Sequence, residues 1–175
     1  PVDRMMLVEI IKGKETGPDA IAAAFDFVRA IGKTPILVND ARGFYANRCV
    51  LNYLLEGHLM LDEGIPPALI ENAARMAGMP VGPLALSDEI ALDLIFKIMK
   101  ATEAALGENA IHPVQARLIS TLVEKMGRYG RKNGQGFYVY PKDGPKHLWS
   151  GLAALVNQHQ NPDSIQIEEL KDRLL

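Results

Sequence analysis

Residues 44–63, a long periodic stretch of the chain, read FYANRCVLNYLLEGHLMLDE. Its apolar residues recur every three or four positions, the spacing of an amphipathic helix. Three further stretches with this period follow, separated by glycines and prolines: 67–77, 84–106 and 114–126. Asp88 and Asp93 interrupt the third of these, so we expect it to form one or two helices. This part of the sequence predicts an α-helical domain, and the fold class is mainly α.

A different pattern precedes these helices. Residues 5–11 (MMLVEII) form a near-continuous apolar run that suits a buried strand, residues 18–31 have helical spacing, and residues 34–38 (TPILV) suit a second strand. Strand, helix and strand with short connections predict a parallel pair with a crossover helix. Because two strands cannot make a sheet alone, we expect residues 1–40 to be the edge of a larger α/β domain.

The last part of the chain is more polar. A glycine-rich basic loop at residues 127–136 is followed by FYVY at 137–140, which predicts a short terminal strand. Trp149 is a candidate anchor for the tail, and residues 165–175 suggest a helix cut off in mid-course.

Composition narrows the class of protein. The chain has 175 residues, 48% of them hydrophobic, with 19 basic and 21 acidic side chains and a net charge of −2. These values exclude collagen-like and disordered chains, and they argue against nucleic-acid binding through phosphate neutralisation. No apolar run approaches about 18 residues, so we expect no membrane span. The single cysteine, Cys49, lies in an apolar helical pattern, where we expect a core position and a reducing compartment.

Two polar residues stand out as candidates for chemistry. Glu9 interrupts the first apolar strand and is either a solvent-facing edge glutamate or a buried functional carboxylate, which could orient a histidine. Asn47 is expected in the first turn of the long helix. Its amide could both donate to a substrate carbonyl and accept from a hydroxyl, or could simply serve as a cap or interdomain hydrogen bond.

The basic loop and the scattered histidines are the remaining candidates. Arg128, Arg131 and Lys132 lie among glycines, an arrangement that could hold a phosphate, imitate an RNA-recognition signature, or form a solvated turn. The histidines show no ligand spacing, so we expect no metal site: His58, His112, His147 and His159. The seven methionines are expected mostly in the core.

Five segments together resemble the L-3-hydroxyacyl-CoA dehydrogenase family in order and spacing. They are PVDRMMLVE at 1–9, GKTP at 32–35, DARGFYANR at 40–48, AGMPVGP at 77–83 and GQGFY at 134–138. The similarity covers residues 1 to about 141. It is greatest to the dehydrogenase region of the multifunctional fatty-acid oxidation complex alpha subunit.

The resemblance implies NAD-dependent oxidation of L-3-hydroxyacyl-CoA to 3-ketoacyl-CoA in fatty-acid β-oxidation. Glu9 matches the glutamate that pairs with the family's catalytic histidine, Asn47 the substrate-side asparagine, and Lys132 a lysine that can reach the cofactor. The histidine precedes the motif proline, which is Pro1, so we expect it, like the glycine-rich dinucleotide fingerprint, outside this chain. The fragment itself is then expected to be inactive.

The resemblance also implies a domain organisation and partners. It assigns residues 1–40 to the edge of the NAD-binding Rossmann domain and 41–141 to a helical domain of the 6-phosphogluconate-dehydrogenase C-terminal type. Residues 142–175 would be a linker and the start of a second helical repeat. The expected partners are an acyl-CoA substrate, a second copy or that repeat, and a thiolase subunit, in the bacterial cytoplasm or a mitochondrial or peroxisomal matrix.

Two interpretations from other classes remain open. The first is a non-catalytic helical module that dimerises or assembles through its apolar faces. The second is a nucleic-acid binder that uses the loop from Arg128 to Tyr140.

Overall fold

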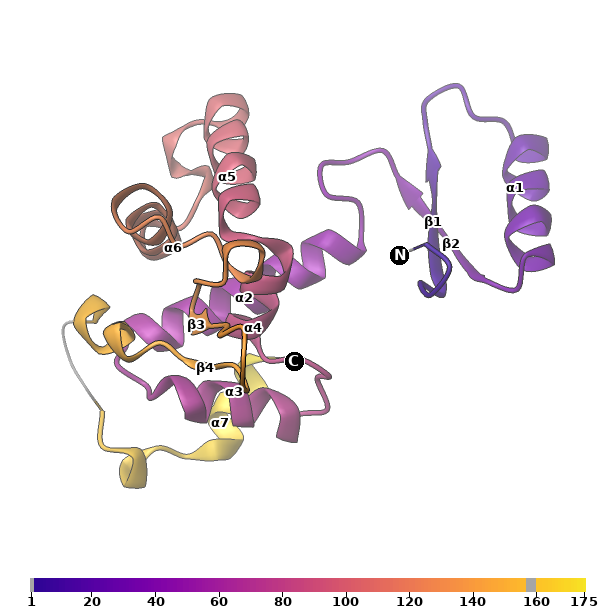
Figure 1. Ribbon diagram of the computed structural model, residues 1–175. Helices are drawn as coiled ribbons and strands as arrows, with labels where there is room; N and C mark the ends of the chain where they lie inside the picture. Colours follow the sequence, from indigo (N-terminus) through magenta and orange to yellow (C-terminus); the bar gives the residue numbers. More distant parts are fainter. Residues whose placement is uncertain (1, 157–159) are drawn as a thin grey trace. The chain divides into compact units, whose positions relative to one another are not determined.

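A computed structural model of the chain describes residues 2–156 and 160–175 (Figure 1). Pro1, the motif proline, and His159 lie outside the described residues. The chain divides into two compact units, Pro1–Leu51 and Asn52–Leu175. The boundaries expected near residues 40 and 141 remain predictions.

The first unit is a strand, a helix and a strand. β1 (Leu7–Lys12) and β2 (Thr34–Asn39) pair in parallel, with Glu9 opposite Ile36, and α1 (Pro18–Ala30) packs on both. Proline at the first position of α1 costs no hydrogen bond, which favours a helix start there. The predicted parallel pair with its crossover is confirmed.

The expectation that the first strand is buried is wrong for this chain. Leu7 and Ile11 of β1 and Leu37 of β2 are each at least 40% exposed. Of the described residues of this unit, Val28 of α1 is the one that is buried. The physical reason is that one helix covers only one face of a two-stranded sheet, so the other face and both strand edges stay open.

The second unit is built on helices, as the apolar periodicity predicts. α2 (Ala46–Asp62) begins in the first unit and is followed by α3 (Pro67–Met76), α4 (Pro83–Ile90), α5 (Leu92–Leu106) and α6 (Pro113–Ser120). A π-helical turn at Thr121–Lys125 continues α6. The core is apolar and includes these fully buried side chains: Leu54, Met60, Leu61, Ile70, Leu84, Leu92, Ile119, Leu122, Phe137 and Leu152. Within the described ranges, no helix is both long enough and apolar enough to cross a membrane.

The stretch at 84–106 forms two helices, and the break is at Ala91 rather than at either aspartate. Ala91 has φ 86° and ψ 121°, a conformation in which a Cβ atom is strained.

We expect Ala91→Gly to stabilise the protein by about 1 kcal/mol, because glycine adopts this conformation without that strain. Urea unfolding would measure it. The matched control, Ala101→Gly on the exposed side of α5, should instead cost about 1 kcal/mol. Destabilisation by both variants would contradict a strained link at Ala91.

The tail folds back on the helices. β3 (Tyr138–Val139) pairs antiparallel with β4 (His147–Leu148), a 3₁₀ helix occupies Ser150–Leu155, and α7 (Ile167–Arg173) packs against α3. Figure 1 shows α7 in yellow beside α3. The buried side chains of Leu170 and Leu174 make this packing apolar.

An ion-pair group strengthens this docking. Arg173 of α7 donates to Glu56 Oε2 at 3.0 Å and to Glu63 Oε2 at 2.7 Å. Glu56 lies in α2, and Glu63 directly follows the end of this helix. The predicted terminal helix is therefore present and is anchored to the body.

Two expectations about buried residues are wrong. Cys49 is exposed rather than in the core, because it lies in the first turns of α2, before the part of that helix that is buried. Of the methionines, Met60 and Met99 are buried, whereas four are exposed: Met5, Met6, Met76 and Met126. Helical spacing identifies an apolar face but does not show whether another element covers it.

Candidate functional site

Glu9 has hydrogen-bond partners far away in the sequence. Its Oε1 atom accepts from the backbone N–H of Tyr45 at 2.8 Å and of Ala46 at 2.9 Å. The side chain is half-buried on the middle of β1. Within the part of the chain that the structure describes, Oε2 accepts no hydrogen bond. Glu9 is therefore not a simple solvent-facing edge residue, since its carboxylate holds the start of α2.

The turn between β2 and α2 brings those two amides to Glu9. Gly43 and Phe44 have φ values of 77° and 49°, so two consecutive residues are left-handed. For Phe44 that conformation costs roughly 1 kcal/mol, whereas glycine adopts it freely. Asn47 follows in the first turn of α2, as predicted, and is exposed. The structure thus places Glu9 against the backbone of Tyr45 and Ala46, which directly precede Asn47, within one unit.

Lys132 lies in the second unit, on the basic loop. Its ammonium pairs with Asp93 at the start of α5 and lies 5.4 Å from the ring centre of Tyr129. Arg131 lies 3.9 Å from Glu89. Each of these cations therefore has a local partner, and an anionic ligand of Lys132 would compete with Asp93 for its charge.

Arg128 corrects the expectation of an exposed basic loop. Its guanidinium is buried, donates to the carbonyl oxygens of Gly136 at 2.7 Å and Tyr138 at 3.2 Å, and stacks 3.9 Å from the ring centre of Trp149. The loop therefore does not offer three free cations to a phosphate backbone. Trp149 anchors the tail to the body, the role expected for it.

Asp88 holds the segment around Phe137 and Tyr138 in place, and it was not among the predicted site residues. Its carboxylate is fully buried and accepts from the N–H groups of Phe137 and Tyr138, each at 2.8 Å, and from the Tyr140 hydroxyl at 3.2 Å. Burial raises the pKa of Asp88 to about 6, against the opposing effects of these donors and of the Arg128 charge. The sequence signal was an aspartate inside an apolar helical stripe.

Gly136 allows this close approach. A Cβ atom on Gly136 would lie 1.9 Å from Asp88 Oδ1, so only glycine fits beside the carboxylate. Glu71 makes a second buried clamp, in which Oε1 accepts from Leu84 N–H at 2.9 Å and Oε2 from the Tyr138 hydroxyl at 2.8 Å. The GQGFY segment is therefore a structural element that the buried carboxylates of α3 and α4 hold in place.

His58 is a core histidine rather than a ligand. Ser87 Oγ donates to the Pro83 carbonyl at 2.8 Å, so it accepts from His58 Nε2 at 3.0 Å, and Gln115 Nε2 donates to His58 Nδ1 at 3.3 Å. This set of bonds fits the neutral tautomer with hydrogen on Nε2. Burial lowers the pKa of His58 to about 3.

The buried His58 predicts acid sensitivity. Its pKa is about 6.5 in an unfolded chain and about 3 in the fold, so between these values the unfolded chain binds more protons and stability falls as the pH falls. We expect the free-energy difference between wild type and His58→Gln to shrink by about 2 kcal/mol from pH 7 to pH 5. The raised pKa of Asp88 acts in the opposite direction in both proteins and cancels. Urea unfolding at the two pH values measures the difference, and a constant value would contradict a neutral buried His58.

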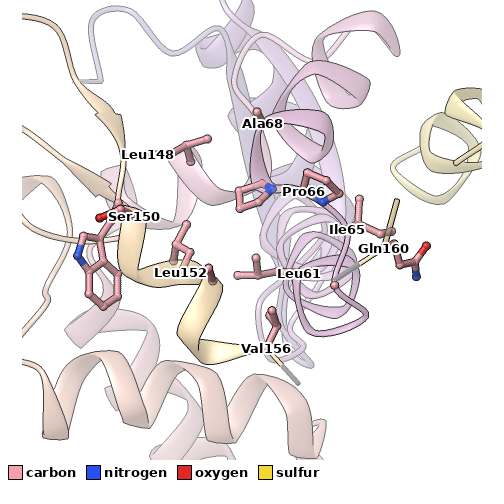
Figure 2. A pocket seen from close by; sticks show the side chains of 13 residues that line it. Leu61, Ile65, Pro66, Ala68, Leu148, Ser150, Leu152, Val156 and Gln160 are labelled. Carbon is pink, nitrogen blue, oxygen red and sulfur yellow. The ribbon is translucent and has the colours of Figure 1, made fainter. Parts of the chain in front are cut away.

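A pocket of about 330 Å³ lies elsewhere in the second unit (Figure 2). Its walls are the turn from Leu61 to Ala68 and the segment from Leu148 to Val156, with Gln160 at one side. The labelled side chains in Figure 2 are mostly aliphatic or proline. The predicted site residues Glu9, Asn47 and Lys132 do not line it.

Comparison with known proteins identifies both parts of the chain. Residues 43–140 match the family model of the 3-hydroxyacyl-CoA dehydrogenase C-terminal domain, and residues 1–41 match that of the 3-hydroxyacyl-CoA dehydrogenase NAD binding domain. The first match alone spans more than half of the chain.

Solved structures agree with this. An (S)-3-hydroxybutyryl-CoA dehydrogenase from Ralstonia eutropha is 35% identical over 81% of this chain and 50% of its own, with a TM-score of 0.68. A 3-hydroxybutyryl-CoA dehydrogenase from Escherichia coli K12 is 29% identical over 81% of this chain and 30% of its own, with a TM-score of 0.68.

A multifunctional enzyme matches more of the tail. The dehydrogenase part of multifunctional enzyme 1 from C. elegans is 26% identical over 98% of this chain and 38% of its own, with a TM-score of 0.68. The chain spans half or less of the length of these three relatives. The matches to both domains establish that this chain belongs to the 3-hydroxyacyl-CoA dehydrogenase family.

Proposed function

We propose that this chain is part of an NAD-dependent dehydrogenase that oxidises L-3-hydroxyacyl-CoA to 3-ketoacyl-CoA in fatty-acid β-oxidation. The observation that carries the proposal is the carboxylate of Glu9, which is held against the turn that begins α2, next to Asn47. A half-buried carboxylate and an exposed amide on adjacent elements suit a site that moves a proton and binds an alcohol or a ketone.

Each residue has a separate role in the proposed reaction. The 3-hydroxyl proton passes to the histidine that the resemblance places before Pro1, and Glu9 orients that imidazole and stabilises its charged form. Oε2 of Glu9 is the atom suited to accept its N–H. Asn47 donates to the 3-keto oxygen of the product or accepts from the 3-hydroxyl of the substrate.

The cofactor fits the residues of this chain only in part. When bound, NAD would supply the acceptor for the hydride that leaves C3. The parallel β1 and β2 pair is of the kind found in dinucleotide-binding sheets. Because Lys132 is already paired with Asp93, we propose it as a peripheral contact with the cofactor.

The tail supports a multifunctional parent. The C. elegans multifunctional enzyme covers 98% of this chain, whereas the two hydroxybutyryl-CoA enzymes each cover 81%. We propose that residues 142–175 lead into a second helical repeat, which would replace a dimer partner, in a bacterial cytoplasmic complex that also carries a thiolase subunit. The isolated chain, which lacks the family's histidine motif and glycine-rich fingerprint, should show little or no turnover.

The alternative is a non-catalytic helical module for assembly. Exposed apolar side chains on one helix favour it, because Leu94, Ile98 and Leu106 of α5 are 46%, 41% and 67% exposed. Such a module needs no ionised carboxylate at Glu9, so the effect of Glu9→Gln in the full-length protein distinguishes the two functions.

The test is an assay of the full-length gene product that contains this chain. NADH oxidation with acetoacetyl-CoA should be rapid, and the isolated 175-residue chain is the matched negative control. A folded full-length product that does not oxidise NADH would overturn the dehydrogenase proposal and leave the assembly module. The same product without acetoacetyl-CoA controls for unspecific NADH loss.

A further inference from the structure

Glu9 closes a structural gap at the start of α2. The first N–H groups of a helix have no partner within the helix, and a negative charge near them is favourable. Here one carboxylate oxygen accepts from two successive N–H groups, those of Tyr45 and Ala46, although Glu9 lies 36 and 37 residues away in the sequence.

The turn that leads into α2 needs these hydrogen bonds because its backbone is not in a preferred conformation. Gly43 and Phe44 are both left-handed, and an L-residue such as Phe44 does not prefer that conformation. The backbone conformation of residues 43 and 44 is therefore stabilised by the contact with Glu9 of β1, not by the local preference of these residues. Asn47 directly follows the two held residues.

We propose that Glu9 is the positioning residue for Asn47. This rests on the proposed function, in which Asn47 contacts the 3-oxygen. Helix geometry fixes the direction of each side chain relative to the preceding backbone, so a carboxylate that fixes residues 45 and 46 also fixes Asn47. Displacement of a reacting contact by about 1 Å can cost 10²-fold in rate.

One side chain would thereby align two parts of the site. Oε1 holds the start of the helix that carries Asn47, and Oε2 would accept from the histidine of the proposed mechanism. The two roles can be separated by substitution. In Glu9→Gln the amide oxygen can still accept both N–H groups while the charge is lost, whereas Glu9→Ala loses both roles.

The first test uses the 175-residue chain and does not depend on activity. Amide exchange of Tyr45 and Ala46, followed by NMR, should be at least about tenfold faster in Glu9→Ala and within about twofold of wild type in Glu9→Gln. Asp40→Asn, which removes an exposed charge near the same turn, is the matched control and should change nothing. Equal exchange in Glu9→Ala and Glu9→Gln would overturn the proposal.

A second variant guards against unfolding. Exchange at Val28, the buried residue of the first unit, shows whether Glu9→Ala has lost the strand, helix and strand structure. Glu9→Asp then takes its place, since it keeps the charge but shortens the reach to Oε1. It should speed exchange at Tyr45 and Ala46 and leave Val28 protected, and unchanged exchange at all three would overturn the proposal.

The second test is a double-mutant cycle in the full-length protein. Asn47→Ala should lower kcat/KM by a similar factor in wild type and in Glu9→Gln, but by less than about threefold in Glu9→Ala, where Asn47 is already misplaced. Equal losses in all three backgrounds would overturn the positioning role. Inactivity of the unmodified full-length protein would instead overturn the proposed function, and the exchange measurements would still decide whether Glu9 holds the residues that directly precede Asn47.

Discussion

Glu9→Gln in the full-length protein is expected to lower kcat for acetoacetyl-CoA reduction by about 10²–10⁴-fold, because a histidine without its carboxylate is neither oriented nor stabilised when charged. The fold should be unaffected, since the glutamine oxygen can replace Oε1 at the Tyr45 and Ala46 N–H groups. Steady-state assays with NADH, combined with circular dichroism of the same preparation, measure both effects. KM for acetoacetyl-CoA should change far less than kcat.

The control for this prediction is an exposed carboxylate near the same turn. Asp40→Asn removes one negative charge and should leave kcat within about twofold of wild type. Activity of Glu9→Gln within about threefold of wild type would show that the carboxylate takes no part in the proton transfer, and would favour the assembly module.

Asp88→Ala should destabilise the helical unit by about 3–5 kcal/mol. The substitution leaves the buried N–H groups of Phe137 and Tyr138 without acceptors and removes a negative charge that acts on the buried Arg128. Asp88→Asn should cost less, because one oxygen remains to accept. Urea unfolding, with an optical signal of the protein recorded at two wavelengths, measures the free energy of unfolding for each variant.

The neighbouring Glu89 provides the matched control. It lies at the surface and faces Arg131 at 3.9 Å, so Glu89→Gln should change stability by no more than about 0.5 kcal/mol. An Asp88→Ala variant as stable as Glu89→Gln would show that the GQGFY segment is held by its apolar contacts and not by the carboxylate.

Local periodicity was sufficient to predict most of the elements. The helix at Pro18–Ala30 and the strand at Thr34–Asn39 match their expected ranges to within one residue at each end. The strained link at Ala91 was not predictable, because an alanine carries no local preference for a left-handed conformation. The burial of β1 was overestimated for a related reason, since an apolar run does not reveal how many layers cover it.

The candidate site was predictable only in part. The type and position of Glu9 suggested a carboxylate with a partner, but its partner amides lie at Tyr45 and Ala46, and long-range pairing cannot be read from one sequence. Arg128 was expected at the surface because three cations lie close together in the sequence. Its burial depends on the carbonyls of Gly136 and Tyr138 and on Trp149, which only the folded chain brings together. The roles of Glu9, Asn47 and Lys132 in chemistry remain proposals.

The stacking of Trp149 on Arg128 provides an intrinsic optical reporter. Trp149 is the single tryptophan of the chain, and its ring lies 3.9 Å from a buried guanidinium in the second unit. Its emission therefore reports the docking of the tail within Asn52–Leu175. Comparison of tryptophan emission with far-ultraviolet ellipticity during denaturation would show, without any label, whether the two units melt together or in succession.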